Sequence, residues 1–155
     1  MTYTLFKFLH LLGVVFLIGN VTVTAVWKVF ADRTHSPIII AFAQRLVTYT
    51  DWAFTLTGVL LLSLGGYGMA MSAHMPLFTQ RWLGWGQAMF ALSGLIWIAI
   101  LVPTQIRQAR ATRAFSAADV VIPESYRMLS RRWLLWGVIA TIPLIVALFL
   151  MTSKF

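Results

Sequence analysis

The sequence predicts an all-α integral membrane protein, a single domain over residues 1–155 built as a four-helix bundle with up-down topology. Hydrophobic residues make up 60% of the chain and charged residues only 10%, whereas a typical soluble domain is about half apolar and about a quarter charged. The mean hydropathy is +0.84. A small domain in water must cover much of its surface with polar groups. Twelve Lys and Arg with four Asp and Glu are too few for that, so we expect lipid to be the solvent.

Four apolar runs predict the membrane spans, and they cover approximately residues 5–29, 52–71, 84–103 and 133–151. Each run holds about 20 residues or more, which at about 1.5 Å per residue crosses a hydrocarbon core of about 30 Å. Lipid offers the backbone no hydrogen-bond partner, so each run is expected to be helical. None alternates with the period of two that a membrane β-barrel needs. The first run is too long for the apolar part of a signal peptide and Lys28 closes it, so we expect it to remain as a span.

The connections between the spans are expected to be partly helical. Residues 38–50 predict an interfacial helix that continues into the second span, and residues 104–115 predict an extension of the third. Residues 116–125 predict a loop, followed by a short helix from Glu124 into the last span. Asp51 lies at the mouth of the second span, where we expect it to cap a helix or pair with Arg45 or a later arginine, in preference to relaying protons.

Basic residues are unevenly distributed between the connections. Three lie on the side of the termini, Lys7, Arg81 and Lys154, and nine lie on the other side: Lys28, Arg33, Arg45, Arg107, Arg110, Arg113, Arg127, Arg131 and Arg132. Lys and Arg accumulate on the cytoplasmic side of membrane proteins. The sequence therefore predicts a multi-pass membrane protein with the first and third connections in the cytoplasm and both termini on the external side. The net charge of +8 is then an orientation signal, and no nucleic-acid partner is expected.

His10 and Asn20 are the residues of the first span that need an explanation, because strongly polar side chains are expensive in lipid. His10 lies near the external end, and Gly13 lies one turn deeper on nearly the same face. This spacing is compatible with a haem or metal ligand beside a glycine that leaves room for a flat ring. It is also compatible with a histidine that bonds to a neighbouring helix and a glycine that allows close packing. Asn20 fits either an interhelical hydrogen bond or contact with a bound cofactor.

A second group of candidate ligands lies at the external end of the second span. Met69, Met71, His74 and Met75 offer thioether and imidazole groups, which suit copper(I) or a haem iron of the His/Met type. They are expected on the same side of the membrane as His10, which favours a shared site. The alternative is that the methionines fill gaps in the core while His74 lies among the headgroups.

Several short motifs resemble those of a known family. They are the run from Leu5 to Gly13, the pair Gly19 and Asn20, the end of the third span at Arg107, the run from Tyr126 to Trp133 and the closing segment from Met151 to Phe155. Over nearly its whole length the chain is similar to a family of bacterial integral membrane proteins of unknown function, the domain of unknown function two-two-six-nine.

That family looks related to the copper-resistance-D-like superfamily, which also holds the membrane protoporphyrinogen oxidase of the J type. In that oxidase a first-helix histidine in a similar Lys-x-x-His context is taken as a haem ligand. The resemblance therefore implies a haem ligand at His10, the one position that carries over. The oxidase also relies on a lysine in a later helix, whereas the span at 84–103 has no lysine here.

Together these features predict a protein of the bacterial inner membrane that binds b-type haem or another tetrapyrrole near the periplasmic face, in electron transfer or tetrapyrrole handling. His10 would be the axial ligand, with Met69, Met71 or His74 as the second. One alternative is copper handling by Met69, Met71, His74 and Met75. Another is a cofactor-free accessory subunit, in a homo-oligomer or a larger membrane complex. No HExxH motif, carboxylate pair or Ser/His/Asp set is present, so any enzyme activity is expected to be that of a membrane oxidoreductase and not of a hydrolase.

Overall fold

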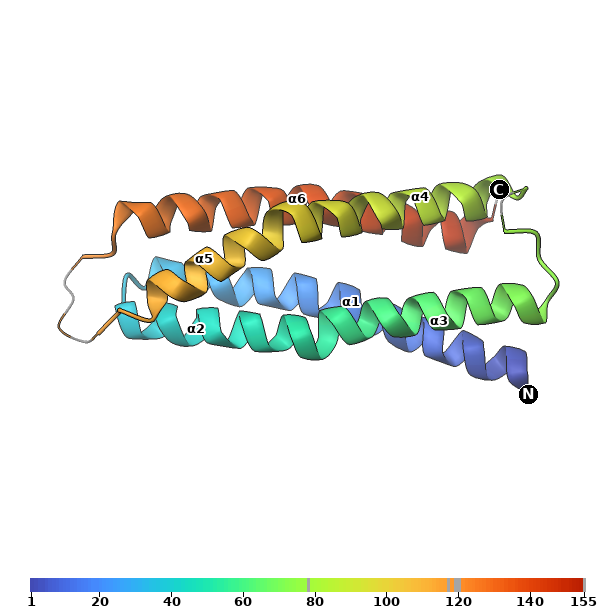
Figure 1. Cartoon of the computed structure of the whole chain (residues 1–155), viewed down its shortest axis with the longest axis horizontal. Helices are drawn as coiled ribbons and strands as arrows, with labels where there is room; N and C mark the ends of the chain where they lie inside the picture. The colour runs from blue at the N-terminus through green and yellow to red at the C-terminus, as the bar shows by residue number, and fades with distance from the viewer. Residues whose placement is uncertain (78, 117, 119–120, 155) are drawn as a thin grey trace.

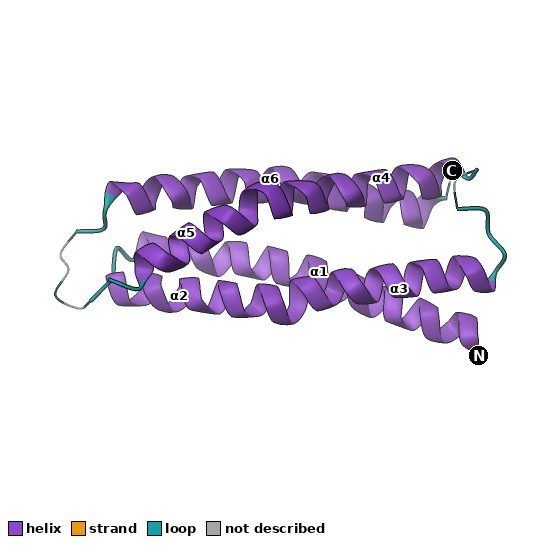
Figure 2. Cartoon of the chain, viewed as in Figure 1, coloured by secondary structure: helices purple, strands orange, loops and turns teal. Residues whose placement is uncertain are grey.

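The computed structural model describes residues 1–155 apart from 78, 117, 119, 120 and 155, and every regular element among them is helical (Figure 2). The elements are α1 (Thr2–Arg33), α2 (Pro37–Thr50), the π-helical turn η1 (Asp51–Leu56), α3 (Thr57–Ser72), α4 (Arg81–Ile96), the π-helical turn η2 (Trp97–Leu101), α5 (Val102–Thr112) and α6 (Glu124–Ser153). Because η1 joins α2 to α3 and η2 joins α4 to α5, the described residues form four helices long and apolar enough to cross a membrane. The prediction of an all-helical chain with four spans is confirmed.

The four long helices extend beyond the apolar runs and cover residues 2–33, 37–72, 81–112 and 124–153. The 32 residues of α1 measure about 48 Å, which exceeds a hydrocarbon core of about 30 Å. Their polar ends stay helical because the backbone keeps its own hydrogen bonds while the side chains reach headgroups and water. The stretch at 38–50 forms a helix that continues into the second span, as the sequence predicts.

The outer surface of the bundle is apolar on every long helix. Val15, Leu64, Leu95 and Phe149 each expose between 63% and 65% of their surface. A soluble protein rarely leaves apolar side chains so extensively exposed, whereas lipid solvates them well. The interior holds the apolar cluster of Val47, Leu101, Trp133 and Ala140.

Figure 1 shows both termini at the same end of the bundle. We call this the terminal end, and it also holds the connection residues 73–77, 79 and 80. We call the opposite end the basic end, and it holds the connection at 34–36 and the connection residues 113–116, 118 and 121–123.

The third long helix changes direction at η2, where α5 leaves the axis of α4 (Figure 1). Pro103 lies in the first turn of α5, and a proline inside a helix lacks an N–H and clashes with the carbonyl four residues earlier. The π-helical turn just before it accommodates this clash. The bend brings α5 against both α2 and α6, which closes the basic half of the bundle.

Glycines let α1 and α3 approach until their backbones touch. A Cβ atom on Gly13 would lie 2.3 Å from the backbone nitrogen of Leu62, and one on Gly65 would lie 2.4 Å from the backbone nitrogen of His10. A Cβ on Gly58 would lie 2.8 Å from the backbone nitrogen of Leu17. Small residues at such contacts are typical of helix packing in membranes, where burial of apolar surface gives little driving force. The contacts also show that α1 and α3 run antiparallel.

Candidate functional site

His10 is held by α3 at the terminal half of the bundle. Its Nδ1 lies 2.8 Å from the carbonyl oxygen of Leu62, so the ring donates this bond through Nδ1–H. The space expected beside Gly13 is filled by the backbone of α3, because Gly13 serves close packing and does not leave an opening. The structure thus supports the packing alternative for Gly13, and a cofactor at His10 stays a prediction.

The Met/His group lies in the last turn of α3 and in the turn that follows it. Met71 exposes 74% of its surface, and His74 has a φ of 49°. The His74 and Met75 amides donate to the carbonyls of Met71 and Ala70, which is the Schellman motif that ends a helix. Among the described residues there is also no group of three His, Cys, Asp or Glu that could hold a metal. Copper binding by Met69, Met71, His74 and Met75 stays a prediction.

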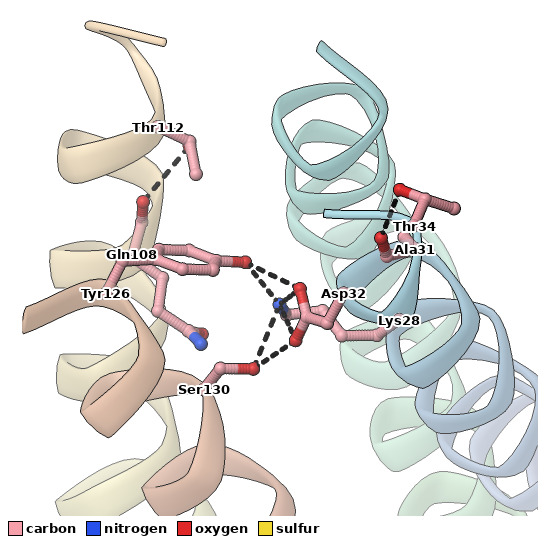
Figure 3. Close-up of polar contacts among 8 residues, drawn as sticks. All are labelled: Lys28, Ala31, Asp32, Thr34, Gln108, Thr112, Tyr126 and Ser130. Carbon is pink, nitrogen blue, oxygen red and sulfur yellow. Dashed lines mark hydrogen bonds and ion pairs between the residues drawn. The ribbon is translucent and has the colours of Figure 1, made fainter. Parts of the chain in front are cut away.

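The most densely bonded polar group lies at the basic end, between α1 and α6 (Figure 3). Lys28 exposes only 2% of its surface. Its Nζ lies 3.2 Å from each carboxylate oxygen of Asp32, 2.6 Å from the phenolic oxygen of Tyr126 and 3.5 Å from the hydroxyl oxygen of Ser130. Tyr126 donates to Asp32 at 3.0 Å, and Ser130 donates to the second carboxylate oxygen. We call Lys28, Asp32, Tyr126 and Ser130 the basic-end cluster.

The basic-end cluster arises from two pairs of residues, each spaced four apart. Lys28 and Asp32 lie one turn apart on α1, and Tyr126 and Ser130 lie one turn apart on α6, so each pair shares one helix face. A buried ammonium is tolerated only when it is paired and hydrogen-bonded. Asp32 supplies the opposite charge, and the two hydroxyls satisfy the remaining bonds.

A second polar group lies further into the bundle. The Asn20 amide donates to the Asp51 carboxylate at 3.0 Å and to the Thr55 hydroxyl at 2.9 Å. Thr55 in turn donates to Asp51 at 3.1 Å, and the buried side chain of Gln105 of α5 lies near this carboxylate. Asn20 therefore makes the interhelical bonds that were one of its two expected roles. We call Asn20, Asp51, Thr55 and Gln105 the inner cluster.

The expected role of Asp51 as a cap or an arginine partner is wrong. The ion pairs among the described residues are Lys28–Asp32 and Arg127–Glu124, and the Arg45 side chain donates to the carbonyl of Ala41. Asp51 lies in a helix that runs without a break from Pro37 to Ser72, where no terminus needs a cap. Its hydrogen-bond partners are the Asn20 amide and the Thr55 hydroxyl.

Two fully buried glutamines lie on α2 and α5. Gln44 of α2 and Gln108 of α5 are 0% exposed. Neither the amide nitrogen nor the carbonyl oxygen of either side chain has a hydrogen-bond partner among the described residues. Such orphaned groups cost about 1–3 kcal/mol each, and buried water is their usual partner. Thr24, also buried, stands on α1 between Asn20 and Lys28 and donates to the carbonyl of Asn20.

A family model described as predicted integral membrane protein (DUF2269) matches residues 4–155. The chain belongs to the DUF2269 family. No curated protein and no solved structure matches it. The family description agrees with the four long apolar helices of the described residues.

In this DUF2269 protein the sequence had singled out the terminal half, whereas the buried ionisable residues lie in the basic half. From the sequence, Lys28 is only the charge that closes the first span, because its partner on α6 is 98 residues away. The sequence signal that could have revealed the basic-end cluster is two pairs of polar residues, each spaced four apart, at the same end of the bundle. These pairs are Lys28 with Asp32 and Tyr126 with Ser130. Gln44 and Gln108 gave no signal, because glutamines near a span end are usually solvated.

Proposed function

We propose that this protein holds a proton relay in the basic half of its bundle, leading from the aqueous phase at the basic end to the carboxylate of Asp51. The observation that carries the proposal is the pair of buried, unpartnered amides of Gln44 and Gln108. Ionisable residues inside a membrane bundle typically mark ion pathways and proton relays. Water bound to the two amides would supply the hydrogen-bonded links that the side chains alone lack.

The order of the polar residues along α1 supports a continuous path. Asn20, Thr24, Lys28 and Asp32 follow each other at steps of four on one helix, so they share a face over about 18 Å. On α5, Gln105 and Gln108 are also about one turn apart. Asp32 is the entry, since a quarter of its side chain is exposed.

Infrared spectroscopy of the protein in lipid nanodiscs tests the proposal. Lowering the pH should produce the carbonyl stretching band of a protonated carboxyl group in the wild-type protein, and Asp51→Asn should remove it. Glu124→Gln is the matched control, because Glu124 is an exposed carboxylate at the same end and its loss should leave the buried band unchanged. A pH-dependent spectrum that is the same with and without Asp51 rejects the relay.

A second candidate function is haem binding at the terminal half, for which the anchored imidazole of His10 is the supporting observation. Its Nδ1–H bond to Leu62 leaves the Nε2 lone pair free, an arrangement that metal-ligating histidines use. The imidazole Nε2 is a suitable ligand for haem iron, but α1 and α3 are in such close contact that the porphyrin ring has no place between them. A Soret band that His10→Ala abolishes and His35→Ala preserves would support haem; no band after reconstitution with haem rejects it.

The basic end is proposed to face the cytoplasm of a bacterial inner membrane. The support is the distribution of Lys and Arg, nine of twelve of which belong to the first and third connections and their flanks, because positive charge is retained on the cytoplasmic side. In that orientation the relay opens to the cytoplasm and His10 lies in the periplasmic half.

A further inference from the structure

An open pocket lies at the basic end, beside the basic-end cluster. Its volume is about 440 Å³, and Tyr126, Ser130 and Asp32 contribute to its wall. The relay does not require a pocket of this size, since one water molecule occupies about 30 Å³ of liquid volume. The pocket therefore has room for a ligand group considerably larger than water.

The pocket carries a strong excess of positive charge. Arg33, Arg127 and Arg131 line it, and the one acidic residue among its described lining residues, Asp32, is already paired with Lys28 at 3.2 Å. Arg127 has an exposed partner in Glu124 at 3.8 Å, and exposed pairs of this kind are weak. Three guanidinium groups are thus available to an anion. Guanidinium groups match phosphate oxygens in geometry and charge.

The pocket is also lined by apolar side chains. Val29, Ile40, Ile122 and Leu134 contribute this apolar surface, and Ile40 and Ile122 belong to a buried core cluster. An apolar wall beside a group of arginines fits a molecule with an anionic head and a hydrocarbon chain. The pocket also lies at a membrane depth that suits an anionic headgroup. The helix α1 is about 18 Å longer than the hydrocarbon core, so its charged last turns reach the headgroup layer.

We propose that this pocket binds the phosphate group of an amphipathic molecule, with the arginines on the phosphate and the apolar wall on the chain. Basic pockets between membrane helices recognise anionic headgroups in this way. The molecule comes from one of two sources, an anionic phospholipid of the bilayer or a free lipid phosphate monoester, and both present the same chemistry to the site. The pocket shares Asp32, Tyr126 and Ser130 with the entry of the proposed relay, but the three arginines belong to neither cluster, so phosphate binding and the relay are tested by different variants.

Native mass spectrometry of the purified full chain in detergent tests this proposal. The probes are phosphatidylglycerol, dodecyl phosphate, phosphatidylcholine and inorganic phosphate, each titrated separately. Wild-type protein should retain phosphatidylglycerol or dodecyl phosphate at least about tenfold more strongly than phosphatidylcholine, which is the effect of one or two charge-assisted bonds. Whichever of the two binds more tightly identifies the source.

The variant Arg33→Gln/Arg127→Gln/Arg131→Gln should lose this preference. The matched control is Arg107→Gln/Arg110→Gln/Arg113→Gln, which removes the same charge from the same end without touching the pocket lining, and it should keep the preference. If both variants lose the preference for the anionic probes equally, the proposal is overturned, because the binding would then be unspecific electrostatic attraction to the basic end. Binding of inorganic phosphate as tight as that of dodecyl phosphate would also overturn it, because the apolar wall would then contribute nothing.

Discussion

Lys28 of α1 donates a hydrogen bond of 2.6 Å to the phenolic oxygen of Tyr126 of α6, 98 residues later in the chain. The ammonium also lies 5.0 Å from the centre of the Tyr126 ring. This contact joins the first and last long helices at the basic end and fixes the ammonium beside Asp32. It gives the buried lysine both a structural task and a place at the entry of the proposed relay.

Removing this lysine should destabilise the fold. Lys28→Met leaves Asp32 without its counter-charge, and because Asp32 is partly exposed we expect a loss of about 2–3 kcal/mol in the free energy of unfolding. Tyr126→Phe removes one hydroxyl and should cost about 1–2 kcal/mol. Denaturant unfolding in detergent micelles measures both. If both variants unfold like the wild type within about 0.5 kcal/mol, the basic-end cluster does not hold α1 to α6.

The glycine contacts between α1 and α3 predict a position-dependent effect of added methyl groups. Gly65→Ala places a Cβ atom 2.4 Å from a backbone nitrogen of α1, so the helices must separate, at a cost of about 1–3 kcal/mol. Gly19→Ala and Gly94→Ala are matched controls with nothing within 4 Å, and higher helix propensity should stabilise them by up to about 1 kcal/mol. Thermal unfolding distinguishes the two classes, and similar effects at all three positions would contradict the close contact.

The side-chain amides of Gln44 and Gln108 have no hydrogen-bond partner among the described residues, so we predict that the fold does not need them for its stability. In Gln44→Leu/Gln108→Leu, apolar groups replace the amides and displace the water we place beside them. We expect an unfolding free energy within about 1 kcal/mol of wild type or higher, because no direct protein hydrogen bond is lost. A loss of more than about 2 kcal/mol would mean that the amides have strong bonds.

The proposed orientation predicts which loops reach the periplasm. The chain contains no cysteine, so single cysteines can be placed without further changes. Thr79→Cys, in the connection at the terminal end, should react with a membrane-impermeant maleimide in spheroplasts. Ala114→Cys, in a connection at the basic end, should react only after the membrane is opened. The reverse pattern would place the basic end outside.

Hydropathy predicts the four spans well because lipid imposes one simple requirement on every residue of a span. It predicts helix ends poorly: α1 continues to Arg33 and α2 begins at Pro37, since a helix in the headgroup layer needs no apolar surface. Composition alone also cannot distinguish a glycine that leaves room from one that is in contact. Gly13 suggested room for a ring, and the structure fills that room with α3.

The candidate site was harder to predict because its partners are distant in the chain. His10 and Asn20 were recognisable from one helix, since a polar residue in an apolar run is conspicuous. Lys28 near a span end resembles any other orienting charge until Tyr126 is brought beside it. Asp51 was expected to meet an arginine, but the fold places Asn20 and Thr55 there instead.

The rate at which Asp51 takes up a proton is the most direct test of the relay. A rapid pH jump followed by time-resolved infrared spectroscopy measures that rate from the carboxyl band. We predict that Gln44→Leu/Gln108→Leu slows it by at least about tenfold, which corresponds to a barrier higher by about 1.4 kcal/mol, while the final extent of protonation stays the same. An unchanged rate in this variant would contradict the relay.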